Sequence, residues 1–455
     1  MNDQPSYQKS LLLCVLLLLS GFAYYFLSYQ TARENFGHII SLFTFLFIVY
    51  YITYKFFSVS HFKYLFIAGI LFRILLIFSI PNLSDDVYRF IWDGRLSANG
   101  INPFSYLPGD VLQMPPAAGI TKQLYGQLNS PDYYTIYPPV LQGIFWLAGK
   151  LFPVNVFAAI VFLKCIIVLF EIATFFWLIQ LLKELSLTKH LSLLYIINPL
   201  VITELTGNVH FEGIISFFIL VSFTLLIRNK WEGSAICLAF AIATKLMPVL
   251  FIPLMIHKLG WKKGLLYFLI TTAITLVLFA FIFDIVTAQH LLKSIDLFIR
   301  KFEFNASIYY VVRWIGTQIT GYNIIAFAGP LLSLIAACIN FFISFNNKKT
   351  FNDVIFVKAL FIITTWFLFS TTIHPWYICL PVALAVVTPF RYTIIWSYTA
   401  TLSYSAYQYN PVHENLLLVC GGYLLMIGCG YYEWKKKSYN NYPKNDNLRS
   451  SGIDN

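Results

Sequence analysis

Asp85, Asp86, Arg89 and Asp93 are the residues whose types and spacing best suit chemistry. The spacing predicts a helix over residues 85–96, in which one face carries a carboxylate, then a guanidinium, then a carboxylate at successive turns. A carboxylate held in this way can accept the proton of a hydroxyl group that attacks an activated donor. Asp85 and Asp86 are therefore both candidate general bases, and the motif does not choose between them. A solvated helix held together by local ion pairs is the alternative interpretation.

Basic residues in a second polar stretch, residues 284–322, are interleaved with aromatic and aliphatic side chains. If the donor is a lipid-linked sugar phosphate, its leaving group is an anion that needs cationic or hydrogen-bonding partners more than a general acid. Basic groups among apolar ones suit a phosphate that is joined to a lipid tail. The candidates for this role are Arg89, Arg300, Lys301 and His374. Each of them can also be an ordinary interfacial or structural side chain.

The composition excludes an ordinary soluble protein. The chain has 455 residues, of which 58% are hydrophobic and 11% charged, and its mean hydropathy is +0.70. A soluble domain carries roughly 25% charged residues, so we expect an all-α membrane protein with many spans. The net charge of +11 comes mainly from Lys and Arg in short loops between apolar segments, which indicates membrane orientation and argues against nucleic-acid binding. The seven cysteines lie in apolar runs without CxxC spacing, so neither a metal site nor a disulfide is expected.

Long apolar segments and the loops between them predict the membrane topology. We expect about 12–14 transmembrane or re-entrant helices, with both termini in the cytoplasm because most basic loops then face the cytoplasm. Residues 81–137 and 284–322 are then two long external loops. Residues 232–257 contain internal prolines and are expected to form a short or re-entrant element beside a polar cavity. Residues 1–437 are expected to form one membrane domain, and 438–455 a disordered cytoplasmic tail.

Ionisable residues inside or near the ends of the apolar segments support an alternative function. A charge at the centre of a membrane helix costs roughly 2.5–3.5 kcal/mol, so such residues are expected to face a cavity or one another. These residues are Arg73, Lys164, Glu171, Glu204 and Lys245. They are compatible with a multi-pass transporter or lipid flippase that has an ionisable path through the membrane. Transporters usually have repeated halves, however, and no repeat is evident in this sequence.

Several segments together resemble a known family. The run SDDVYRFIWDGRLSANGINPFSY is followed in order by YYTIYPPVLQGIF, INPLVITELTGNVHFEG, ATKLMPVLFIP, KFEFNASIYYVVRW and TTIHPWYICLPVAL. They resemble the GT-C superfamily of polyprenyl-phosphate-sugar-dependent glycosyltransferases, and within it the bacterial polyprenol-phosphate-mannose-dependent α-mannosyltransferases. The resemblance implies a GT-C-like fold and a catalytic Asp in the first external loop, at Asp85 or Asp86. Tyr137 matches the family's YPP element, and Asp93 resembles an acidic position of a more distant relative.

The residues and the resemblance together predict an inverting membrane glycosyltransferase. It would move a hexose, mannose by resemblance, from a polyprenyl-phosphate donor to a lipid or glycan acceptor on the non-cytoplasmic face of the bacterial inner membrane. Besides the two candidate bases, the residues expected to bind substrates are Arg89, Asp93, Arg95, Tyr137, His210, Lys245, Arg300, Lys301 and His374. The acidic-x-acidic motif of the family is absent, so no metal is implied, and no cofactor is expected. The expected partners are the lipid-linked donor, the acceptor and membrane lipids.

Overall fold

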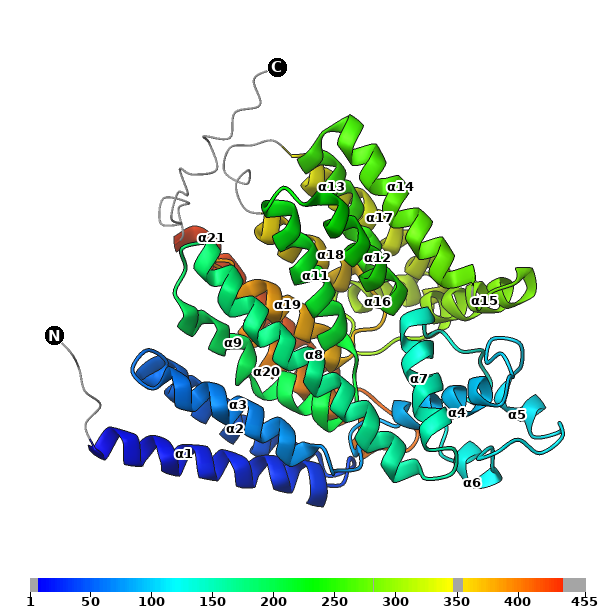
Figure 1. Ribbon diagram of the computed structural model, residues 1–455, viewed down its shortest axis with the longest axis horizontal. Coiled ribbons are helices and arrows are strands. Elements are labelled where there is room, and N and C mark those ends of the chain that lie inside the picture. Colours follow the sequence, from blue (N-terminus) through cyan, green and yellow to red (C-terminus); the bar gives the residue numbers. More distant parts are fainter. Residues whose placement is uncertain (1–6, 281, 347–354, 437–455) are drawn as a thin grey trace.

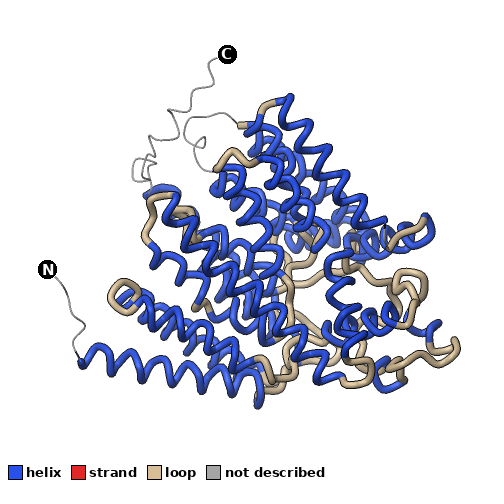
Figure 2. Tube along the Cα trace, viewed as in Figure 1, coloured by secondary structure: helices blue, strands red, loops and turns tan. Residues whose placement is uncertain are grey.

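Apolar runs of about 20 residues, long enough to cross the hydrocarbon core, form the long helices of the protein. In the computed structural model, which describes residues 7–280, 282–346 and 355–436, six helices are long and apolar enough to cross a membrane. They are α1 with the π-helical turn η1 (Tyr7–Gln30), α2 (Phe36–Phe57), α8 (Val156–Glu184), α14 (Trp261–Ala280), α17 (Ile325–Phe345) and α21 (Leu416–Lys436). The described ranges contain helices and loops but no strand (Figure 2). The prediction of an all-α membrane protein with several spans is confirmed.

A pair of helices bends sharply and forms a further candidate span. The first part, α10 with η3 (Pro199–Gly207), meets α11 (Glu212–Ile227) at 115°. A helix bent this far does not cross as one straight rod, so the pair is a broken span or a re-entrant loop, with residues 208–211 as the turn between its two parts. Val209 in this turn has a positive φ of 62°, a conformation that non-glycine residues adopt rarely.

Shorter helices complete the bundle. Four apolar ones cover Trp231–Thr244 (α12), Met247–Leu259 (η4 and α13), Ile355–Phe369 (α18) and Pro375–Ala385 (η5 and α19). The remaining helices are α3 (Phe62–Leu76), α4 (Asp86–Ala98), α5 (Pro108–Val111), α6 (Lys122–Tyr125), α7 (Pro139–Leu151), η2 (Lys189–Ser192), α9 (Leu193–Ile196), α15 (Ile285–Lys301), α16 (Ile308–Thr320), α20 (Tyr392–Thr399) and η6 (Ala400–Gln408). The predicted break in residues 232–257 is confirmed, because α12 ends before Lys245 and Pro248 lies in the first turn of the next helix.

The two ends of the molecule differ in character. The first residues of α1 and the last residues of α21 lie on one side, whereas α4, α5, α6 and α7 gather at the opposite end (Figure 1). Most of the long loops also lie at that opposite end (Figure 2). Residues 81–137 and 284–322, predicted as the two long external loops, carry the short helices α4, α5 and α6 and the helices α15 and α16 respectively.

Helix α4 is fixed against α7 by close backbone contact. A Cβ added to Gly149 would lie 2.3 Å from the carbonyl oxygen of Gly94, so only glycine allows the two helices to approach this closely. Next to this contact, the buried rings of Phe90 and Phe145 stack with centroids 4.8 Å apart. The helix that begins with the two candidate bases is therefore held rigidly by its C-terminal half.

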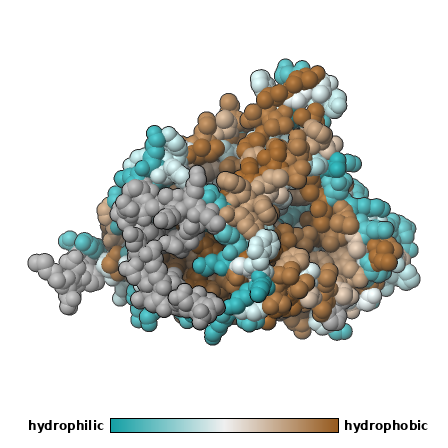
Figure 3. Space-filling model, turned by 90° about the horizontal axis from the view of Figure 1, so that it is seen from above, coloured by the Kyte–Doolittle hydropathy of each residue, from teal (hydrophilic) through white to brown (hydrophobic). Residues whose placement is uncertain are grey.

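Apolar side chains also cover much of the outer surface. On α14, Leu265, Leu269 and Leu276 are all more than half exposed, and Figure 3 shows hydrophobic residues over much of the face seen from above. A continuous apolar surface of this kind is typical of a helix that is surrounded by lipid rather than by water. This surface agrees with the membrane interpretation of the sequence.

Candidate active site

The two neighbouring aspartates begin α4 and point to different partners. Asp85 precedes the helix and its carboxylate pairs with the Arg33 guanidinium at 2.7 Å. Asp86 is the first helical residue, and its Oδ1 accepts a hydrogen bond of 2.6 Å from the Asn129 amide. Its Oδ2 lies 3.8 Å from Nε2 of His210, which is an ion-pair distance. Asp86 also lies in the first turn of α4, where the N-terminus of a helix favours a negative charge.

His210 lies in the turn between η3 and α11 and is itself held by a buried carboxylate. Its Nδ1 contacts the backbone oxygen of Glu204 at 3.0 Å and Oε2 of the same residue at 3.3 Å. Asn208 and Tyr404 both donate hydrogen bonds to Glu204 Oε1. Because these partners fix Glu204, the imidazole ring has one orientation, with Nε2 directed toward Asp86.

The charges of this pair support each other. Burial by itself lowers the pKa of His210, but contact with Asp86 and Glu204 outweighs burial and raises that pKa to about 9. Burial by itself raises the pKa of Asp86, but the contact and charge of His210 and the hydrogen bond from Asn129 hold that pKa below its usual range. At neutral pH, Asp86 is therefore a carboxylate beside an imidazolium.

A second histidine, His374, lies in a stack of aromatic rings with His210 but differs from it in charge. The Trp376 ring lies between His210, 3.7 Å away, and His374, 4.3 Å away, and Phe304 stacks on the far side of His374 at 5.0 Å. Burial, which the neighbouring Asp86 offsets only in part, lowers the pKa of His374 to about 4. His374 is thus a neutral ring, and its Nδ1 is buried with no hydrogen-bond partner within the described residues.

Lys245 adds a cation to this cluster. It ends α12, pairs with Glu212 at 2.6 Å, and lies over the ring of Tyr377 at 3.6 Å. The Tyr377 ring also contacts His374, with ring centroids 5.5 Å apart. The positive charge of Lys245 is close enough to act on Asp86. The ends of several helices thus gather three carboxylates, Asp86, Glu204 and Glu212, around two cations, His210 and Lys245.

Asp93, Tyr137 and the two arginines of α4 have structural contacts that the sequence does not reveal. Arg89 bonds to Asp93 at 2.9 Å and to two backbone carbonyls. Arg95 is buried, donates to the Gly119 carbonyl at 2.8 Å, and leaves its Nε and Nη2 without partners among the described residues. Tyr137 packs edge-on against Phe90, with ring centroids 4.9 Å apart, and burial raises the pKa of its hydroxyl, which lies within range of the Asp86 charge.

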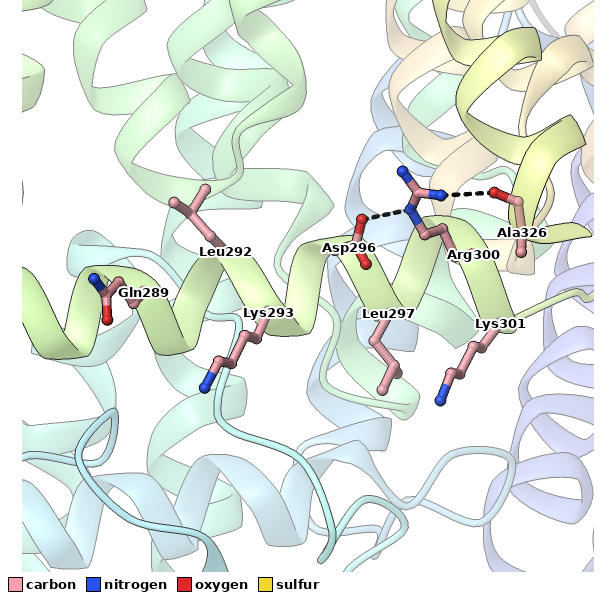
Figure 4. A pocket seen from close by; sticks show the side chains of 8 residues that line it. All are labelled: Gln289, Leu292, Lys293, Asp296, Leu297, Arg300, Lys301 and Ala326. Atoms are coloured by element: carbon pink, nitrogen blue, oxygen red, sulfur yellow. Dashed lines mark hydrogen bonds and ion pairs between the residues drawn. The ribbon is translucent and has the colours of Figure 1, made fainter.

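The two basic candidates of the second external loop lie on α15, along a groove of about 620 Å³. Figure 4 shows Lys293, Leu297 and Lys301 pointing to one side of the helix. Arg300 points to the other side, where it pairs with Asp296 at 2.6 Å and donates to the backbone oxygen of Ala326. The groove combines apolar and cationic groups, as expected for an interfacial helix.

Of the five residues predicted from mid-membrane charge, three lie within the helix bundle and two belong to the Asp86 cluster. Arg73 and Glu171 form a fully buried ion pair at 2.5 Å, and Tyr195 donates to the same glutamate. Lys164 is also fully buried and donates to the carbonyls of Leu76 and Ser79 at the end of α3. Glu204 and Lys245, in contrast, belong to the cluster around Asp86.

Arg33, Asn129 and Trp376 contact this cluster although the sequence did not single them out as site residues. Trp376 is two residues from His374 in the segment HPWY, so the sequence could predict that it lies near the site. The sequence could not predict that its ring stacks between two histidines. Arg33 and Asn129 lie in loops with no distinguishing pattern. Among the described residues, no group of three or more His, Cys, Asp or Glu is arranged to hold a metal ion.

Residues 5–260 match the family described as alpha-(1->6)-mannopyranosyltransferase, N-terminal domain (MptA_B family), which is more than half of the 455-residue chain. The chain belongs to this family. The resemblance to polyprenol-phosphate-mannose-dependent α-mannosyltransferases is thereby confirmed, and the protein is a membrane mannosyltransferase. None of the curated proteins matches the chain.

The matched part of the mannosyltransferase contains most of the cluster. Asp85, Asp86, Asn129, His210 and Lys245 all lie within residues 5–260. The groove on α15 and the ring stack at His374 and Trp376 lie in the C-terminal part, beyond the match. The two parts of the chain are joined at the candidate site, where His210 from the first stacks on Trp376 from the second.

Proposed function

We propose that this mannosyltransferase moves a mannose from a polyprenyl-phosphate donor to a hydroxyl group of a lipid or glycan acceptor on the non-cytoplasmic face of the membrane. The acceptor oxygen attacks C1 of the sugar from the side opposite the phosphate, so the configuration at C1 is inverted. The bond from C1 to the phosphate oxygen breaks, and the polyprenyl phosphate leaves with the electron pair. The proton of the acceptor hydroxyl goes to an aspartate.

The observation that carries this proposal is the placement of Asp86. Its carboxylate begins α4, keeps one oxygen on Asn129, and faces a positively charged histidine with the other. Its side chain is 21% exposed, so a substrate hydroxyl can reach it. Asp85 instead pairs with Arg33 at the surface, which favours Asp86 as the base of the pair.

The cationic side of the cluster supports a phosphate leaving group. His210 and Lys245 carry positive charge, and His374 has a buried ring nitrogen without a partner among the described residues. A developing phosphate anion needs such charges and donors. Nε and Nη1 of Arg89 already bond to Asp93 and to two backbone carbonyls, so we do not place this residue at the phosphate.

The groove on α15 supports a role in receiving the lipid part of the donor. Lys293, Leu297 and Lys301 line it and point to the same side of α15 (Figure 4). A lysine near a membrane surface attracts an anionic lipid headgroup by about 1 kcal/mol. We assign Arg300 and Lys301 to this entry region and His210, Lys245 and His374 to the phosphate during transfer.

The positive-inside pattern of the basic loops supports a bacterial inner-membrane location with both termini in the cytoplasm. With this orientation, the end of the molecule that carries α4 and the cluster faces away from the cytoplasm. A topology reporter fused after Leu96 is expected to report the non-cytoplasmic side, and a cytoplasmic result would remove the proposed donor from reach.

The proposed base is tested by two matched substitutions. Purified protein in detergent is incubated with polyprenyl-phosphate mannose labelled in the sugar and with a membrane extract as acceptor. Asp86→Asn is expected to lower transfer by about 10²–10⁴-fold, the usual contribution of a general base. Asp85→Asn removes only a surface ion pair and is expected to keep most of the activity. Full activity of Asp86→Asn in correctly folded protein would refute Asp86 as the base.

A further inference from the structure

Residues 129–135 cross the external end of the molecule between α4 and α15 without forming a helix. Side chains from other elements hold this segment by its backbone. Arg89 Nη1 donates to the carbonyls of Ser130 and Tyr133, both at 2.9 Å. Ser294 on α15 donates to the next carbonyl, that of Tyr134, at 3.0 Å.

Arg89 is in turn fixed by buried polar groups. Its Nε bonds to Asp93 Oδ1 at 2.9 Å, and Gln142 on α7 donates to Asp93 Oδ2 at 3.1 Å. All three side chains are at most 3% exposed. Because α7 packs rigidly against α4 through Gly94 and Gly149, the guanidinium has a fixed position relative to the start of α4.

The residue just before the first of these carbonyls is Asn129, whose amide donates to Asp86 Oδ1 at 2.6 Å. We propose that Arg89 and Asn129 form a positioning device, in which Arg89 fixes the segment 129–133 so that Asn129 holds the Asp86 carboxylate in the orientation required for proton transfer. The inference rests on the proposed function, because it needs Asp86 as the base. Arg89 acts through Asn129 and does not touch the substrate.

The device has two physical consequences for Asp86. Because Oδ1 is held, the free lone pairs of Oδ2 face one direction, and the carboxylate is already oriented for proton transfer before the acceptor binds. The hydrogen bond also favours the charged form of the carboxylate, so losing it makes Asp86 bind a proton more tightly. A variant without the device should therefore be slower and should lose its activity at a higher pH on the acid side.

Asn129→Ala tests the device at its contact with Asp86, and Asn99→Ala is the matched control. Asn99 is also an exposed asparagine of the same external loop, and it also donates from its Nδ2, to the carbonyls of Arg95 and Ala118, but it ends α4 at the other terminus. We expect Asn129→Ala to lower kcat about tenfold with KM changed by less than about twofold, and to move the acid limb of the pH profile upward by about one unit. Asn99→Ala should behave like the unaltered enzyme.

Arg89→Lys tests the clamp itself, because lysine keeps the charge opposite Asp93 but has no planar fork to bond a carboxylate and two carbonyls together. If Arg89 acts through Asn129, the double variant Arg89→Lys, Asn129→Ala should be no slower than the slower single variant, and independent effects would multiply. Size-exclusion chromatography shows whether Arg89→Lys is folded; if it is not, Asn129→Ala decides alone.

Two results would overturn the inference. The first is an Asn129→Ala enzyme with the kcat and pH profile of Asn99→Ala. The second is a double variant whose loss equals the product of the two single losses. If Asp86→Asn is inactive and Asn129→Ala is unaffected, the base stands and only the device fails. If Asp86→Asn is fully active, the proposed base itself fails.

Discussion

The ion pair between His210 and Asp86 predicts a specific change in the pH dependence of transfer. His210→Gln keeps a polar side chain of similar size but removes the positive charge 3.8 Å from Asp86 Oδ2. At that distance the attraction between unit charges is about 1 kcal/mol in water and about 4 kcal/mol at an effective dielectric constant of 20. Asp86 is 21% exposed and His210 is 3% exposed, so the true value lies between these limits.

Since one pKa unit corresponds to about 1.4 kcal/mol, losing the charge should raise the pKa of Asp86 by roughly one to three units. The carboxylate must be ionised to act as a base, so activity falls as pH drops through that pKa. The acid limb of kcat/KM against pH should therefore move upward by the same amount in His210→Gln. On the alkaline side, His210 of the unaltered enzyme loses its proton as pH rises through about 9, and activity should fall with the loss of that positive charge. This alkaline limb of the pH profile should be absent from His210→Gln.

The assay is initial mannose transfer from labelled donor between about pH 4 and pH 10, with thermal unfolding in detergent measured for each variant. His413→Gln is the control, because His413 is exposed and its ring contacts only the Tyr409 ring among the contacts described. If His210→Gln and the unaltered enzyme share both limbs, His210 does not act on the base, and the electrostatic reasoning is wrong.

Two further predictions concern other parts of the molecule. Glu171→Gln leaves the buried Arg73 charge uncompensated and should lower the free energy of unfolding by about 3–5 kcal/mol. Glu184→Gln breaks a partly exposed pair with Arg228 and should lower it by about 1 kcal/mol or less. Thermal unfolding in detergent compares the two variants, and equal losses would contradict the argument from burial of the first pair. Lys293→Glu and Lys301→Glu should each raise KM for the lipid-linked donor roughly fivefold and leave kcat nearly unchanged. The control variant Lys150→Glu, on the exposed surface of α7, should leave both constants unchanged. An unaltered KM in the two groove variants would exclude the groove from donor binding.

Local sequence patterns were sufficient to predict the helix that begins at the proposed base. The charge spacing predicted a helix over residues 85–96, and α4 covers Asp86–Ala98. Prolines likewise predicted the break in residues 232–257. These features depend on neighbours within about four residues along the chain, which is the range over which helix spacing and proline act.

The residues that contact Asp86 could not be predicted from the sequence, because they are distant from it along the chain. Asn129 lies 43 residues from Asp86, and their contact depends on how Arg89 folds the intervening loop. His210 meets Trp376 only because two distant parts of the chain pack together. The choice between Asp85 and Asp86 also needed these contacts, since both residues are identical in type and adjacent in sequence.

The charged residues predicted at mid-membrane also show what the sequence could not predict, because it identified the residues but not their partners. The sequence shows that Arg73, Lys164 and Glu171 are ionisable residues in apolar helices, and such residues can form an ion path or a structural pair. The structure gives the pair: Arg73 bonds to Glu171, and Lys164 caps the carbonyls at the end of α3. These side chains bond to one another or to backbone carbonyls, which is the arrangement expected of charges that hold helices together.

The charges around Asp86 lie at helix ends instead, and this difference supports our proposal that the reaction takes place there. Asp86 begins a helix, Lys245 ends one, and His210 lies in a sharp turn between two. Helix ends leave backbone groups without partners, so they bring water and polar side chains to places where an intact span would exclude both. A transfer reaction needs a reachable base and an anion site, and an unbroken buried pair provides neither. The broken helices of this mannosyltransferase are therefore where we expect substitutions to change turnover, whereas substitutions at Arg73 or Glu171 should change stability.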